Sequence, residues 1–70
     1  MIEVFKTNVT NTPEADKVLR LFAHEFPDFK VNFDLEDCDK ILRVEGTFID
    51  PMKIIELVVS QGCFCEILDN

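Results

Sequence analysis

The stretch that decides the fold of this 70-residue chain is residues 29–46, FKVNFDLEDCDKILRVEG. Apolar and polar residues alternate through 29–35 and again through 41–46, which is the period-two pattern of half-buried β-strands. Only the polar segment 36–40 separates the two runs. This short spacing predicts an antiparallel hairpin with one apolar face.

A helix is expected on each side of this hairpin. The strand-like run 2–9 is followed by Asn11-Thr12-Pro13, a cap-and-proline signal for a helix start, and apolar residues then recur at helical spacing as far as Pro27. Asp50-Pro51 repeats the start signal, and Gly62 is a natural stop for the second helix.

Residues 63–68 form the last expected strand. The order strand, helix, strand, strand, helix, strand predicts one domain over residues 1–70. Its fold class is α+β, a ferredoxin-like βαββαβ sandwich with a four-stranded antiparallel sheet and two helices on one face. Its connectivity brings the loop 8–13, the turn 36–40 and the Gly62-Cys63 junction to one end of the sheet, where we expect any site, and places His24 at the other end.

The composition excludes several function classes. Lys and Arg number 7 against 14 Asp and Glu, so the formal charge is −7, which is unsuited to nucleic acid or to an anionic membrane surface. No apolar run is long enough to span a membrane, and no export signal is evident. We therefore expect a soluble cytoplasmic protein whose 3 cysteines stay reduced. No nucleophile–base pair or cofactor motif is present, so neither an enzyme nor a cofactor is expected.

The residues resemble the heavy-metal-associated (HMA) domain of small copper chaperones and metal-pumping ATPases. The resemblance covers the whole chain and is carried by the hairpin 34–44, by Asp50-Pro51 and by Gly62-Cys63-Phe64-Cys65-Glu66. It implies a ferredoxin-like fold and a copper-binding C-x-x-C motif between the first strand and the first helix. Here that motif is replaced by Asn11-Thr12-Pro13-Glu14.

The family's copper site is therefore not expected in this chain. Asn11 and Glu14 occupy the positions of the two ligand cysteines, and amide and carboxylate oxygens are hard donors that do not select Cu(I). We interpret the two residues as a helix-capping pair. The Asn11 side chain would accept from the backbone near Glu14, and the Glu14 side chain would reach back to the backbone of Asn11.

A different soft-metal site is one alternative. Cys63 and Cys38 lie on neighbouring loops of the predicted fold and could bind Cu⁺ or Zn²⁺, with Asp37, Asp39 or Glu14 completing the shell for the harder ion. Cys65 is predicted to fill the core. The acidic segment 34–39 is interpreted as a solvated turn, and His24 suits the negative end of its helix without a catalytic role.

The second helix carries more apolar residues than one buried stripe needs. Ile55, Val58, Val59 and Met52 are expected to suffice for the core, which leaves Ile54 and Leu57 on a flank as a candidate interface. Ile2, Val4 and Ile41 are candidates for the open face of the sheet.

These observations favour an HMA-like protein-interaction or oligomerising module, with either a second copy or another protein as partner. The alternatives are a soft-metal carrier that uses Cys63 with Cys38, and a small-molecule-sensing ferredoxin-like domain.

Overall fold

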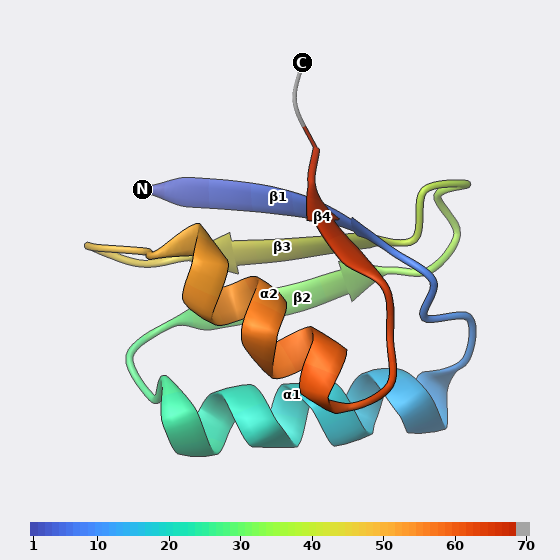
Figure 1. The fold of residues 1–70 in the computed structure, drawn as a ribbon, viewed down its shortest axis with the longest axis horizontal. Helices are drawn as coiled ribbons and strands as arrows, with labels where there is room; N and C mark the ends of the chain where they lie inside the picture. The colour runs from blue at the N-terminus through green and yellow to red at the C-terminus, as the bar shows by residue number, and fades with distance from the viewer. Residues whose placement is uncertain (69–70) are drawn as a thin grey trace.

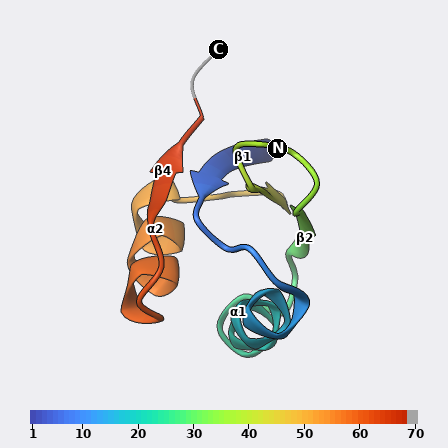
Figure 2. The same ribbon diagram turned by 90° about the vertical axis from the view of Figure 1, so that its right-hand side faces the viewer.

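The computed structural model describes residues 1–68 and has the predicted α+β architecture (Figure 1). Its elements are β1 (Ile2–Thr7), α1 (Thr12–Glu25), β2 (Lys30–Asp34), β3 (Ile41–Glu45), α2 (Pro51–Ser60) and β4 (Cys65–Ile67). The strands form one sheet in the order β2-β3-β1-β4, and each neighbouring pair is antiparallel. Both helices cover the same face of the sheet (Figure 2), so the ferredoxin-like βαββαβ topology is confirmed.

The sheet turns the apolar side of the hairpin toward the helices. Phe5 of β1 lies opposite Leu42 of β3, which in turn lies opposite Phe33 of β2. Phe5 and Leu42 are fully buried, and Phe33 packs against the core at its edge. The outer face of the sheet mixes three aliphatic residues with charged neighbours, in the register pairs Ile2–Glu45, Val4–Arg43 and Ile41–Lys6.

Helix α1 forms as its start signal predicts. The Asn11 side-chain oxygen Oδ1 accepts the backbone N–H of Glu14 at 2.9 Å, which satisfies one of the free donors at the helix start. Ala15, Val18 and Phe22 are buried at offsets of three and four residues, so this face of α1 packs on the sheet. The helix ends before Pro27, where proline would remove a helical hydrogen bond.

Helix α2 presents a different face from the one predicted. Ile54 is fully buried and Leu57 is partly buried against the core, so the proposed flank of Ile54 and Leu57 is wrong as an exposed interface. Met52 is 60% exposed and Val59 is 52% exposed, although both were expected in the core. The apolar residues of α2 cover two overlapping stripes, and the packing of Ile54 and Val58 selects the stripe that is buried.

Three loops meet at one end of the sheet, as the connectivity predicts. The Thr7 hydroxyl donates to the carbonyl oxygen of Lys40 at 2.6 Å, which ties the end of β1 to the hairpin turn. The backbone N–H of Phe64 donates to Asn8 Oδ1 at 2.8 Å, which ties the loop after β1 to the segment before β4. Residues 63 and 64 therefore join this loop cluster, and β4 is shorter than the strand predicted over 63–68.

Candidate functional site

The end of the molecule that holds the loop 8–13 contains Asn11, Glu14 and Cys63. Cys63 is 8% exposed, and its Sγ donates to Glu14 Oε1 at 3.5 Å. Burial raises the pKa of the Cys63 thiol, and the hydrogen bond and charge of Glu14 raise it further. Of the predicted capping pair, the Asn11 half is confirmed. The Glu14 half is wrong, because this carboxylate binds the Cys63 thiol instead of reaching back to the backbone of Asn11.

These residues do not fit a Cu(I) ion. Asn11 Oδ1 is used as the helix cap and Glu14 Oε1 accepts from a neutral thiol. Cu(I) requires soft donors, and Cys63 is the one sulfur among these three residues. Its raised pKa also disfavours the thiolate form that binds metals. The first-strand loop of this chain is therefore a helix cap packed against a buried thiol.

Cys63 and Cys38, predicted as joint ligands of a soft metal ion, have different neighbours in the structure. Within residues 1–68, three potential metal ligands lie close together in the hairpin turn: Asp37, Cys38 and Asp39. Their ligand atoms are all within 4.8 Å of one another. Cys63 is not in this set and binds Glu14. The turn is braced internally, because the Asp39 N–H donates to Asp37 Oδ1 at 2.8 Å, and its Cys38 is exposed.

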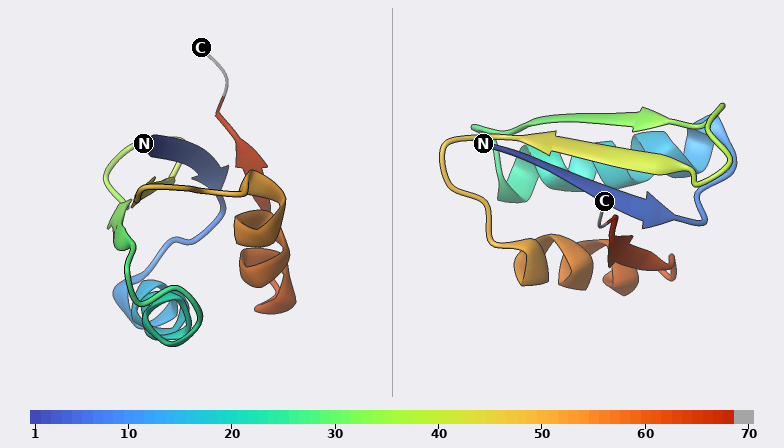
Figure 3. Two further views of the ribbon diagram at one scale, coloured as in Figure 1. Left: turned by 90° about the vertical axis from the view of Figure 1, so that its left-hand side faces the viewer. Right: turned by 90° about the horizontal axis from the view of Figure 1, so that it is seen from above.

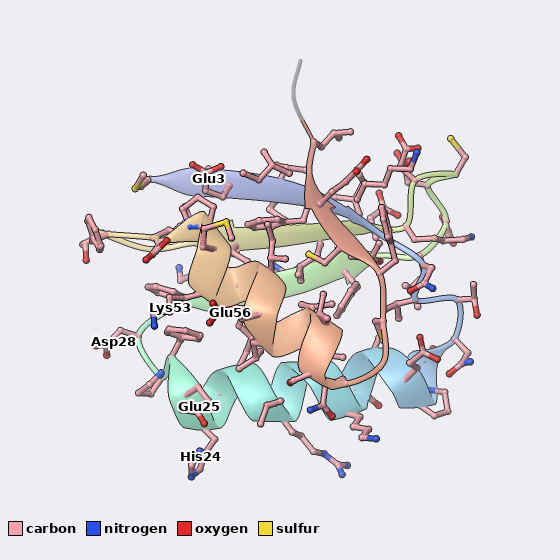
Figure 4. The ribbon with its side chains drawn as sticks, viewed as in Figure 1. Glu3, His24, Glu25, Asp28, Lys53 and Glu56 are labelled. Carbon is pink, nitrogen blue, oxygen red and sulfur yellow. The ribbon has the colours of Figure 1, made fainter. Side chains whose placement is uncertain are left out.

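Cys65 lies in the core, as predicted. It is 7% exposed, and burial together with the negative potential of Cys63 and Glu66 raises its pKa to about 12. His24 is exposed at the far end of α1, with Nδ1 at 3.9 Å from Glu25 Oε1 (Figure 4).

The opposite end of the sandwich holds an open pocket of about 370 Å³. It is lined by Asp28 in the loop before β2, by Lys30 at the start of β2, by Glu45 at the end of β3, and by Gly46 and Thr47 in the loop that follows. The lining side chains Asp28, Lys30 and Glu45 are all exposed. The connectivity predicts that any site lies at the end with the loop 8–13, the turn 36–40 and the Gly62-Cys63 junction, so the sequence did not predict this pocket.

Exposed apolar residues gather at this same end. Phe48, in the loop between β3 and α2, is 75% exposed, and Met1 and Met52 are each 60% exposed. The segments that carry them converge there (Figures 1 and 3), and the Gly46 N–H donates to the carbonyl oxygen of Met1 at 3.0 Å. We call Met1, Phe48 and Met52 the apolar end surface. In the sequence, the loop between β3 and α2 carries two adjacent apolar residues, Phe48 and Ile49, and the structure buries Ile49 while it exposes Phe48.

Charged side chains surround the apolar end surface and the pocket. Figure 4 shows Glu25 at the end of α1, Asp28 in the next loop, and Lys53 and Glu56 on α2, all toward this end of the molecule. Among the described residues, no three carboxylates here bring their oxygens within 4.8 Å of one another. The arrangement is therefore a dispersed acidic rim, unlike a site for a metal ion.

Comparison with known proteins adds no relative: no protein-family model matches the chain, and no curated protein matches it significantly. No helix within residues 1–68 is long and apolar enough to cross a membrane.

Proposed function

We propose that this chain is a non-catalytic protein-binding domain of the HMA lineage that does not carry copper. The observation that carries the proposal is the apolar end surface of Met1, Phe48 and Met52, because an aromatic side chain left 75% exposed beside two exposed methionines costs solvation free energy unless a partner covers it.

The loop that gives HMA domains their copper site supports the non-metal part of the proposal. Its two key positions hold oxygen donors, both already engaged, and its nearest thiol is buried with a raised pKa. The ferredoxin-like topology agrees with the resemblance to HMA domains. Because this fold hosts many functions, the argument for the HMA lineage comes from the sequence motifs and not from the fold.

A cytoplasmic location is part of the same proposal. Cys38, Cys63 and Cys65 are all free in the structure, and free thiols suit a reducing compartment. The chemistry of the pocket favours binding over catalysis, because its charged side chains are open to solvent and catalytic groups usually need a desolvated environment.

Copper competition tests the proposal directly. The reduced protein and its Cys38→Ser and Cys63→Ser variants are titrated with Cu(I) against a chromophoric chelator. We expect wild-type binding no tighter than that of a generic thiol and nearly unchanged by Cys63→Ser. Tight binding that is lost in either variant would instead identify a soft-metal carrier.

A gain-of-function variant tests the lineage. Asn11→Cys combined with Glu14→Cys restores the C-x-x-C spacing at the start of α1, where the helix dipole stabilises thiolates. If the loop has the HMA geometry, the double variant acquires Cu(I) binding that survives Cys63→Ser. A double variant that folds and still does not compete with the chelator argues against an HMA origin.

A further inference from the structure

The charges around the apolar end surface indicate what kind of partner it accepts. The adjoining pocket has two carboxylates, Asp28 and Glu45, and one ammonium, Lys30, which lies opposite Glu45 in the sheet register. The pocket is therefore net negative, and the chain as a whole carries −7. A cationic side chain would gain attraction both from the pocket and from the field of the whole molecule.

Two other occupants are disfavoured by the structure. A metal ion requires several oxygens at one point, and the described carboxylates at this end do not converge in sets of three within 4.8 Å. A second copy of the chain would bring another charge of −7 against this end, and the pocket offers two carboxylates against the single ammonium of Lys30.

We propose that this end of the molecule binds a peptide segment of a partner protein in which a lysine or arginine adjoins apolar side chains. The cationic side chain enters the pocket between Asp28 and Glu45, and the apolar side chains cover Phe48 and Met52. The inference rests on the proposed function, because it names the partner for the same apolar end surface.

The partner chemistry is tested with three synthetic amphipathic peptides of about 14 residues, roughly four helical turns. They share their leucine positions and one tryptophan, and their polar positions are all Lys, all Gln or all Glu. The protein has no tryptophan or tyrosine, so the fluorescence anisotropy of the peptide reports binding to the full chain without interference.

Matched variants separate this end from the general acidity of the chain. Asp28→Asn with Glu45→Gln removes the two pocket carboxylates, whereas Asp16→Asn with Glu66→Gln removes two exposed carboxylates elsewhere. Phe48→Ser removes the exposed ring, and Phe64→Ser removes another ring that is 46% exposed at the opposite end. Circular dichroism confirms that each variant is folded.

We expect the Lys peptide to bind more tightly than the Gln and Glu peptides. The pocket variant should weaken it about fivefold, as expected for two exposed ion pairs, and the control pair should change it less than about twofold. Phe48→Ser should weaken binding and Phe64→Ser should not.

Other outcomes overturn the inference in distinguishable ways. If the Gln peptide binds as tightly as the Lys peptide and still depends on Phe48, the cationic partner is wrong while the protein-binding function stands. If both double variants weaken the Lys peptide equally, the attraction is unspecific and the inference fails. If no peptide binds in a Phe48-dependent way, the proposed function fails as well. A concentration-dependent dimer that Phe48→Ser dissociates would make the partner a second copy.

Discussion

Replacing Gly46 by alanine should destabilise the domain by crowding one aromatic ring. An added Cβ would lie 2.5 Å from Cδ1 and 2.7 Å from Cε1 of Phe29. The Phe29 ring cannot retreat freely, because it is stacked on Phe26 with a centroid distance of 5.1 Å and an interplanar angle of 6°. Overpacking of this kind costs about 1–3 kcal/mol, and loss of the aromatic stacking would account for about 0.5–1.5 kcal/mol of it.

Urea unfolding followed by far-ultraviolet circular dichroism measures this effect. With a denaturant slope of about 1 kcal/mol per molar urea for so small a domain, the midpoint of Gly46→Ala should fall by about 1–3 M. Gly62→Ala is the matched control: its added Cβ meets nothing within 4 Å, so any cost there comes from its positive φ of 81°.

A double-mutant cycle identifies the cause. In a Phe29→Leu background the ring is gone, so the cost of Gly46→Ala should shrink while that of Gly62→Ala stays the same. A Gly46→Ala variant within about 0.5 kcal/mol of wild type would refute the close approach of the ring. So would a cost that is unchanged in the Phe29→Leu background.

Burial, helix capping, thiol reactivity and thiol ionisation give four further predictions. Ile54→Ala should lower the free energy of unfolding in urea by about 2–5 kcal/mol, whereas Val59→Ala should change it by no more than about 0.5 kcal/mol. A larger loss for Val59→Ala than for Ile54→Ala would mean that Val59 and not Ile54 lies in the core. Asn11→Ala should cost about 1 kcal/mol and Asn11→Asp much less, and equal losses would show that the cap contributes nothing. Near pH 8, a thiol reagent should label exposed Cys38 in the folded protein and reach Cys65 only after unfolding. The Cys65 thiol has a pKa of about 12 in the folded chain, against about 9 for an ordinary thiol. The unfolded chain therefore loses this proton first, and the free energy of unfolding should fall as pH rises above about 9. A flat pH profile between about pH 9 and 12 would contradict the burial of Cys65.

The fold could be predicted from the sequence because its signals are local. The alternation in residues 29–35 and 41–46 depends only on which side chains share a face of a strand, and the cap-and-proline starts at Asn11 and Asp50 depend only on the first turn of each helix. The resulting order of elements leaves few topologies, and the observed sheet is one of them.

The face of α2 could not be predicted in this way. Its mixture of Met52, Ile54, Val58 and Val59 fits two helix rotations almost equally well. The choice between them depends on packing against the sheet, which is a tertiary effect.

The candidate site was missed for a related reason. Its pocket joins Asp28 to Glu45 and Thr47, residues from separate segments whose meeting requires the completed sheet and loops. The expectation of a site near Asn11 and Glu14 rests on the connectivity, which gathers three loops at that end of the sheet, and on the family resemblance. Phe48 could not be singled out either, because its neighbour Ile49 in the same loop is buried in the core, and which of the two apolar side chains is exposed depends on tertiary packing.

Amide chemical-shift mapping with the Lys peptide tests the central claim most directly. A ¹⁵N-labelled sample is titrated, and the shifts of every assigned backbone amide are followed. Binding at the apolar end surface and its pocket predicts the largest changes in residues 28–30 and 45–53, with little change in 8–14 and 62–64. Changes concentrated around Asn11, Glu14 and Cys63 would instead place the binding surface at the opposite end of the sheet and contradict the account.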